Sequence, residues 1–330
     1  MTTETAGPVQ GPVQGAVQAY AELQPSLLVV TDAYIDQVTR LLDDAGINYL
    51  SVTGRTKSVP SFAAKANRSA PGTAAHDDPL NGITDQVGVR VITYVLSDVA
   101  AVAQLLADQL HVLDDRDMAQ ETASKGSFGY ASRHVLVEDA KRPLTRPASV
   151  QIRTVLQHAW AEFEHDIRYK GTIPEEHVPD LDRRFTLAAG LLELADREFS
   201  EIRDRLQAAT PQHRHGDPAD PRLSAQDLAA FLSGQYADAG WSRTDHYAWI
   251  SGLLLELGIT SLEELAGLLT SVDSEVINSR LAYKYPPGAV RRLDDALLAV
   301  FGQGYVDLTG NAHRKELLAT RLEKLRADES

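Results

Sequence analysis

The pattern of hydrophobic and polar positions predicts a mixture of helices and strands over the first two thirds of the chain. Between residues 21 and 45, apolar side chains such as Leu28, Tyr34 and Val38 recur at helical spacing, and Gly46 is placed to end that helix. Strands are predicted at residues 49–57, 87–96, 129–137 and 148–153, and further helices at 98–110, 154–166 and 180–209. This order predicts an α+β fold in which a mixed sheet of about five strands is flanked by helices.

The two ends of the chain have a different character. Residues 1–20 contain the repeat GPVQ-GPVQ-GAVQ and are expected to form a disordered leader, so that residues 21–210 make up the first domain. Prolines and polar residues at 211–222 indicate a linker. Residues 223–330 show repeated helix-start signals and are expected to form a small all-α domain.

Composition narrows the class of function. The 330 residues carry a net charge of −14 and no cysteine. Without cysteine the chain has no disulfide, thiol nucleophile or thiolate zinc site, and its composition fits a cytoplasmic protein. No apolar run approaches the ~20 residues that span a membrane, and the acidic excess argues against broad binding to DNA. An anionic ligand would therefore need a local basic pocket.

A first group of candidate residues lies between positions 55 and 65. Arg55 and Lys57 share one face of a predicted strand, because side chains two residues apart in an extended chain point the same way. Ser61 and Lys65 are four residues apart, which places them on one helical face. Three cations and a hydroxyl suit a polyphosphate, although a solvated basic face would give the same pattern.

The entry to the strand predicted at 87–96 forms a second group. The carboxylate of Asp85 could bind Mg²⁺ that bridges phosphate oxygens, or it could serve only as a turn or helix-cap residue. Gly88 allows close approach of a ligand. Arg90 shares a face with apolar residues, so it is expected to have an anionic partner.

A third group follows Gly129. Tyr130, Ser132 and His134 share one face of a predicted strand. A tyrosine with polar companions at these positions suits stacking on a purine base, although a half-buried strand tyrosine would look the same.

The last group spans the strand predicted at 148–153 and the helix after it. Ser149, Gln151 and Arg153 share one strand face, while the intervening residues point to the core. Helical spacing then places His158 and Glu162 on one side of the next element.

Together these motifs resemble the synthetase domain of the RelA/SpoT family, which makes the alarmone (p)ppGpp, and particularly the small synthetases without a hydrolase domain. The matching segments are GRTKSVPSFAAK at 54–65, DQVGVR at 85–90, GYASRH at 129–134 and QIRTVLQHAWAEFEHDIRYK at 151–170. The resemblance covers about residues 21–209. It implies a nucleotidyltransferase-like fold and a GTP pyrophosphokinase, which passes the β,γ-pyrophosphate of ATP to the ribose 3′-hydroxyl of GDP or GTP.

The resemblance also implies a role for each matching residue. ATP would be held by Arg55, Lys57, Ser61, Lys65 and Arg90. The acceptor nucleotide would be held by Lys125, Tyr130, His134, Gln151, Arg153 and His158. Asp85 would bind Mg²⁺, and the catalytic positions would be Asp85, Ser149 and Gln151. The implied partners are ATP and GDP or GTP, with a homo-oligomeric assembly, no membrane and no DNA. The helical C-terminal domain suits contact with a protein partner.

Two positions depart from the family pattern. At Ser149 the family normally carries a glutamate, which contacts metal and is placed to take the proton of the 3′-hydroxyl, whereas a serine hydroxyl is a far weaker base. Phe128 stands where the acceptor loop often has asparagine. Glu162 and Glu138 are the other carboxylates to test, although Glu138 lies ~13 Å beyond His134 along an extended strand.

The sequence therefore predicts (p)ppGpp synthesis and leaves two alternatives open. One is a nucleotide-binding regulator whose catalysis is weak or absent because of Ser149. The other is a related pyrophosphotransferase that uses an adenine nucleotide or an RNA 3′ end as its acceptor.

Overall fold

The computed structural model describes residues 12–69, 73–118, 121, 132–139, 144, 146–170, 177–208, 221–240, 242–283, 285 and 287–327. The predicted acceptor residues Lys125 and Tyr130 lie outside these ranges, as do Phe128, residues 1–11 and most of the predicted linker. The chain divides into two compact units. Unit 1 comprises residues 1–39, 50–92 and 109–190, and unit 2 comprises residues 40–49, 93–108 and 191–330.

The bounds of these units cut through two long helices, whereas the sequence placed residues 21–210 in a single domain. The end of the first helix, residues 93–108 and the last helix of that range from residue 191 onward are assigned to unit 2. The boundary at residues 211–222 stays a prediction, because residues 211–220 lie outside the described ranges.

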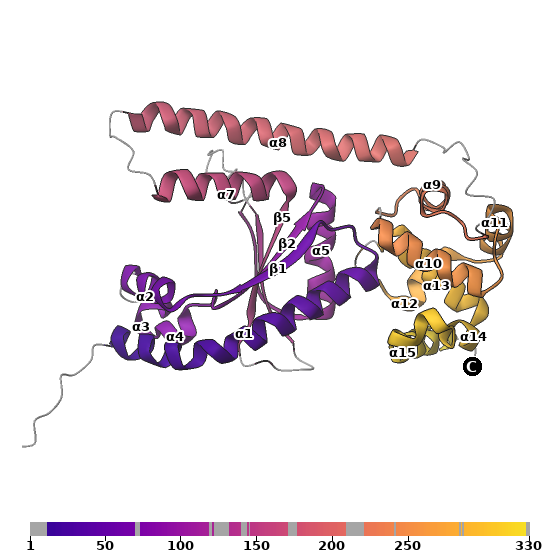
Figure 1. Ribbon diagram of the computed structural model, residues 1–330, viewed down its shortest axis with the longest axis horizontal. Helices are drawn as coiled ribbons and strands as arrows, with labels where there is room; N and C mark the ends of the chain where they lie inside the picture. The colour runs from indigo at the N-terminus through magenta and orange to yellow at the C-terminus, as the bar shows by residue number, and fades with distance from the viewer. Residues whose placement is uncertain are drawn as a thin grey trace, which may run out of the picture. The chain divides into compact units, whose positions relative to one another are not determined.

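A five-stranded sheet forms the centre of unit 1 (Figure 1). Its strands are β1 (Ser51–Thr56), β2 (Val87–Thr93), β3 (His111–Asp117), β4 (Arg133–Glu138) and β5 (Ala148–Thr154). The strand order is β1-β2-β5-β4-β3, and the pairs β1/β2, β3/β4 and β4/β5 are antiparallel in a sheet that is mixed as a whole. The predicted α+β fold with about five strands is therefore confirmed.

The sequence pattern did not predict strand β3. Its sequence HVLDDRD is mostly exposed and charged, so it lacks the apolar alternation of a core strand. It lies at one edge of the sheet, where charged side chains discourage pairing with another chain.

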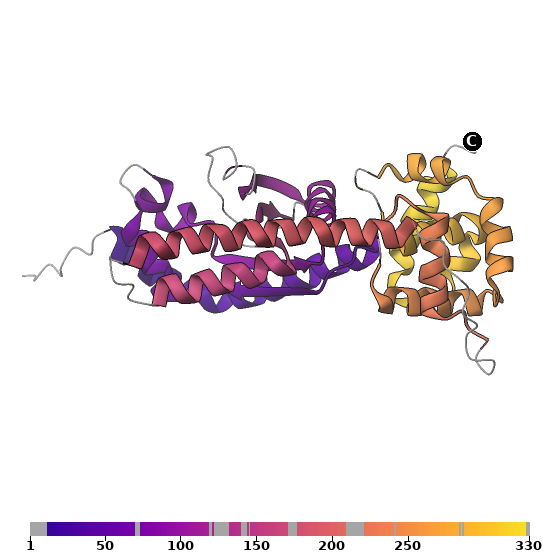
Figure 2. The same ribbon diagram turned by 90° about the horizontal axis from the view of Figure 1, so that it is seen from above.

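The helices that accompany these strands are α1 (Pro12–Ala45), α2 (Val59–Arg68), α3 (Ala74–Asp77), α4 (Pro79–Gly82), α5 (Leu96–Gln109), α7 (Val155–Lys170) and α8 (Val178–Ala208). Trp160 and Phe163 of α7 contact Phe185 of α8, with ring centroids 5.6 and 5.9 Å apart. Figures 1 and 2 show α7 running beside the first part of α8. This aromatic cluster holds α8 against the helix that follows β5.

Helix α1 corrects the prediction of a disordered leader over residues 1–20, because it begins at Pro12. Tyr20 is fully buried, stacks on Phe62 with ring centroids 4.1 Å apart, and donates a hydrogen bond of 2.7 Å to the carbonyl of Lys57. Tertiary packing of one aromatic side chain thus overrides the Gly- and Pro-rich composition.

Gly46 ends α1, as the sequence predicted. Its φ of 65° is left-handed, and two backbone hydrogen bonds close the helix end, from Gly46 to Asp43 and from Ile47 to Leu42. This pair of bonds is the Schellman motif, which favours glycine because a side chain is strained at positive φ.

The described residues between 223 and 330 are helical, as predicted. The helices in this region are α9 (Ala225–Gln235), α10 (Thr244–Glu256), α11 (Leu262–Thr270), α12 (Ser274–Leu281), α13 (Ala289–Phe301), α14 (Gln303–Val306), η2 (Thr309–Arg314) and α15 (Lys315–Arg326). Their apolar faces meet in one core that includes Leu232, Ile250, Leu293 and Tyr305. Among the described residues, no helix has the length and apolar character needed to cross a membrane.

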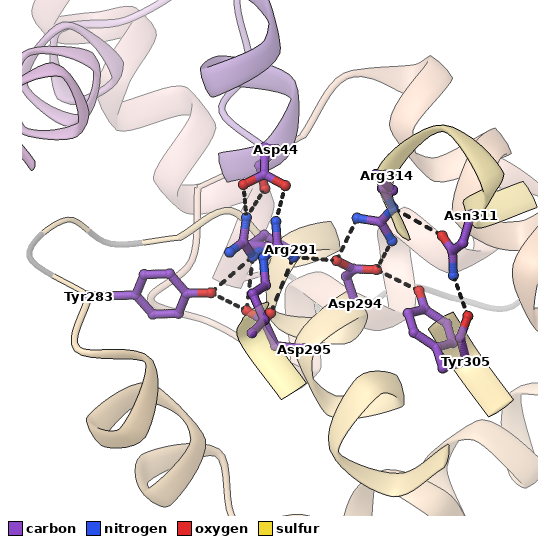
Figure 3. A network of polar contacts seen from close by, with 9 residues as sticks. Asp44, Tyr283, Arg291, Asp294, Asp295, Tyr305, Asn311 and Arg314 are labelled. Carbon is purple, nitrogen blue, oxygen red and sulfur yellow. Dashed lines mark hydrogen bonds and ion pairs between the residues drawn. The ribbon is translucent and has the colours of Figure 1, made fainter. Parts of the chain in front are cut away.

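A network of buried charges crosses unit 2 (Figure 3). Arg291 donates to Asp44 at the end of α1, over 2.6 Å, and to Asp295 over 3.0 Å. Arg321 pairs with Asp44 and, over 2.9 Å, with Asp294. Buried charges are costly unless they are paired, so this network fixes the end of α1 against α13 and α15 within the unit.

Candidate functional site

The predicted donor residues of β1 and α2 come together around Asp85. Lys57, just after β1, donates to Asp85 Oδ2 over 2.8 Å. Lys65 on α2 donates to Asp85 Oδ1 over 3.0 Å. Lys57 is nearly buried, with 9% of its side chain exposed, whereas Lys65 is 42% exposed. One carboxylate therefore holds two lysines that approach it from different elements.

The ion pairs set the charge state of Asp85. Burial alone would raise its pKa, but the hydrogen bonds and charges of Lys57 and Lys65 outweigh burial and hold the pKa below its usual value. Asp85 is therefore ionised at neutral pH and is a poor proton acceptor.

Helix α2 begins beside this cluster for a local reason. Ser58 is its N-cap, and its hydroxyl accepts a hydrogen bond from the backbone N–H of Ser61. The Ser61 hydroxyl is 2.9 Å from the Ser58 hydroxyl, and Lys65 follows one turn later. Ser61 is thus placed at the start of the helix that carries Lys65, and it is exposed to solvent.

A small hollow of about 90 Å³ lies beside Asp85. It is lined by Thr53, Gly54, Arg55, Asp85, Gly88, Val89, Arg90, Ser149 and Gln151. These residues come from β1, from β2 and the turn before it, and from the start of β5. The structure thus gathers Arg55, Asp85, Arg90, Ser149 and Gln151, which the sequence predicted as parts of one site.

The alternation predicted for β5 is confirmed. Val150 and Ile152 are fully buried, whereas Ser149 and Gln151 are partly exposed and line the hollow. Ser149 therefore presents a hydroxyl at the position where the resemblance implied a carboxylate.

His134 on β4 lies next to this face of β5. The register pairs His134 with Gln151, and His134 Nε2 is 2.6 Å from the hydroxyl of Ser132. Burial, and then the positive charges of Arg153 and Arg116, lower the pKa of His134 below its usual value. His134 is consequently neutral near pH 7, and a contact with phosphate would be a hydrogen bond without a full charge.

Arg90 has the anionic partner that its strand position led us to expect. Its Nη1 atom lies 2.9 Å from Glu162 Oε1 on α7. His158, one turn earlier, places Nδ1 3.7 Å from the same oxygen. Burial and the charge of Arg90 lower the pKa of His158. Burial also lowers the pKa of Arg153 to about 10, and Arg90 adds to the effect while Glu162 opposes it.

The residues around the hollow offer few ligands for a metal ion such as Mg²⁺. The described residues contain no group of three or more histidine, cysteine or carboxylate side chains that could hold a metal, and Asp85 is the one carboxylate lining the hollow. Mg²⁺ commonly binds through one or two carboxylates, substrate phosphates and water. The site therefore fits a Mg²⁺ ion that arrives with a polyphosphate, and Asp85 is the residue that would hold it.

The chain is similar in sequence to known proteins. The sequence profile described as "Region found in RelA / SpoT proteins" matches residues 54–173. The GTP pyrophosphokinase YjbM of Bacillus subtilis (strain 168) is 32% identical over 174 residues, which are 48% of this chain and 74% of that protein. The chain belongs to the RelA/SpoT family. The GTP pyrophosphokinase YwaC of the same organism is 30% identical over 114 residues, 32% of this chain and 53% of that protein.

Two solved structures of a small alarmone synthetase are similar to part of the chain. The small alarmone synthetase 1 from Bacillus subtilis is 28% identical, covers 60% of this chain and 95% of its own, and gives a TM-score of 0.39. The same synthetase bound to its product pppGpp is 27% identical, covers 59% of this chain and 95% of its own, and gives 0.41.

Two features of the site in this RelA/SpoT protein could not be predicted from the sequence alone. Lys57 and Lys65 pair directly with Asp85, although Lys57 and Asp85 are 28 residues apart. Glu162 was identified only as one of two carboxylates to test, and its contact with Arg90 singles it out from Glu138. Glu138 instead lies 3.8 Å from His111 on β3.

A larger cavity, about 840 Å³, lies within unit 2. Arg291 and Arg314 line it, but both are already paired with carboxylates of the buried network. We therefore place the candidate site of this RelA/SpoT protein at the smaller hollow of unit 1, where the family motifs converge.

Proposed function

We propose that the protein passes the β,γ-pyrophosphate of ATP to the ribose 3′-hydroxyl of GDP or GTP and so makes (p)ppGpp. The observation that carries this proposal is the meeting of Lys57, Lys65 and Asp85 beside a hollow lined by Arg55 and Arg90. Membership of a family whose relatives are named GTP pyrophosphokinases supports the reaction class.

The side chains act mainly by position and charge. Lys57 and Lys65 exchange part of their contact with Asp85 for the phosphates of ATP, and Arg55 approaches from β1. Mg²⁺ held by Asp85 and the phosphates would neutralise charge that develops on the transferred group. Because phosphoryl-type transfer needs little covalent participation by the protein, such clamps supply most of the rate.

On the acceptor side, we propose that Gln151, His134, Arg153 and His158 hold the guanine nucleotide. The pairing of His134 with Gln151 and the position of His158 one turn before Glu162 support a common site. Lys125 and Tyr130 are proposed to complete it from the segment outside the described residues.

A second candidate function rests on Ser149. With a hydroxyl at the hollow where a base is expected, the protein would bind nucleotides as a regulator and transfer pyrophosphate slowly or not at all. An acceptor other than guanine nucleotide is tested by the same experiment.

The test is to incubate purified protein with labelled ATP, Mg²⁺ and GDP, GTP, AMP or a short RNA, and to separate the products by ion-exchange chromatography. We expect labelled (p)ppGpp together with an equal amount of AMP from ATP. Lys65→Met should abolish formation of (p)ppGpp, whereas Lys324→Met on α15 should leave it unchanged. Nucleotide binding without any product would support the regulator, and product with AMP or RNA alone would change the acceptor.

We also propose that the chain forms a homo-oligomer. Leu187, Leu191 and Leu194 on α8 follow one another at helical spacing and are 59, 68 and 49% exposed, which supports an apolar contact surface. Light scattering coupled to gel filtration tests this, and Leu191→Lys should lower the measured mass.

A further inference from the structure

Glu162 lies between Arg90 of the proposed ATP site and His158 of the proposed acceptor site. Its Oε1 atom is 2.9 Å from Arg90 Nη1 and 3.7 Å from His158 Nδ1. Its side chain is 56% exposed. Because Arg90 also lines the hollow beside Ser149, Glu162 is one contact away from the reaction site.

The carboxylate and the hydroxyl that line the hollow at Asp85 and Ser149 are poor proton acceptors. Both oxygens of Asp85 already receive hydrogen bonds from lysines. The Ser149 hydroxyl is a weak base at neutral pH. Glu162 differs from both, because it is a half-exposed carboxylate whose closest partner, Arg90, lines the hollow and can turn to a polyphosphate.

We propose that Glu162 performs the proton transfer for which Ser149 is unsuited, by accepting the proton of the acceptor's 3′-hydroxyl. This inference rests on the proposed function. When phosphates enter the hollow, Arg90 turns to them and leaves the Glu162 carboxylate available to the hydroxyl. The carboxylate that accepts the proton thus lies on helix α7 and not on strand β5.

The step balances as follows. The O3′–H bond breaks, and its proton passes to Glu162. The O3′ atom forms a bond to the β-phosphorus of ATP, and the bond from that phosphorus to the oxygen bridging the α-phosphate breaks. AMP leaves with the bridging oxygen and its electron pair. A positioned base of this kind contributes typically ~10²–10⁴-fold to the rate.

The test compares Glu162→Gln with wild type in (p)ppGpp synthesis. Glutamine keeps an oxygen that can accept from Arg90, so the variant should fold and bind an ATP analogue as wild type does. We expect kcat to fall by ~10²–10⁴-fold, with KM for ATP nearly unchanged. Adding Ser149→Glu to this variant should restore at least ~10-fold of the rate, because it returns a carboxylate to the site from β5. Glu193→Gln, which removes an exposed i,i+4 pair with Arg197 on α8, is the matched control.

The outcomes separate the inference from the function on which it rests. An active wild type with an equally active Glu162→Gln overturns the role of Glu162 and leaves the proposed function standing. Loss of ATP-analogue binding in Glu162→Gln, without rescue by Ser149→Glu, would mean that Glu162 only positions Arg90. A wild type that is inert with every acceptor overturns both proposals.

Discussion

The two lysines that share Asp85 should contribute very differently to stability. Their distances to the carboxylate are similar, 2.8 Å for Lys57 and 3.0 Å for Lys65, but 9% of the Lys57 side chain is exposed against 42% for Lys65. Hydrogen bonds between charged groups with little solvent contact contribute about 1.5–3 kcal/mol, whereas solvent-exposed ion pairs contribute about 0–1 kcal/mol. We therefore expect coupling energies near ~2 kcal/mol for Lys57–Asp85 and below ~1 kcal/mol for Lys65–Asp85.

Double-mutant cycles measure these two energies against each other. The variants are Lys57→Met, Lys65→Met, Asp85→Asn and the two double variants with Asp85→Asn. Urea denaturation is monitored by hydrogen exchange in peptides from β1, β2 and β5, which reports the stability of unit 1 separately from that of unit 2. The shared carboxylate is the internal control, because only the lysine differs between the cycles.

Equal coupling energies, or a larger value for Lys65, would refute this reasoning. They would show that burial of the lysine does not govern the strength of the pair. The expected result would instead show that Lys57 is held firmly by Asp85. It would also show that Lys65 can leave Asp85 for a polyphosphate with a smaller loss of free energy.

Three further predictions concern other parts of the chain. Tyr20→Ala should destabilise unit 1 by about 3–5 kcal/mol in urea denaturation, since it removes a buried ring stacked on Phe62, whereas Gln18→Ala on an exposed face should leave stability unchanged. Asp294→Ala should destabilise unit 2 by about 3–5 kcal/mol, because Arg314 and Arg321 lose a buried partner, and Asp180→Ala at an exposed pair should have almost no effect. The free energy of unfolding of unit 1 should fall as the pH is lowered through about 6.5, because His134 and His158 have lowered pKa values in the folded state and unfolding then takes up protons. His134→Asn should reduce the dependence of this free energy on pH in denaturation curves. An unchanged pH dependence would argue against a buried neutral histidine.

Local periodicity in the sequence determined which side chains share one face of a strand or helix. In β5, Ser149 and Gln151 had to share a face opposite Val150 and Ile152, because side chains alternate in an extended chain. The end of α1 at Gly46 was equally predictable, since only glycine adopts that conformation without strain. Three of the segments that resemble the family likewise contain residues that line the hollow, namely Arg55, Asp85, Arg90 and Gln151.

Tertiary structure alone decided which of these elements meet. The pair Lys57–Asp85 joins residues 28 apart, and Arg90–Glu162 joins a strand to a helix 72 residues later. Such contacts depend on strand order and on how α7 packs after β5, and local patterns do not encode either. The start of α1 at Pro12 depends in the same way on Tyr20 meeting Phe62. Sequence thus set the faces of the elements, and packing set the partners that those faces acquired.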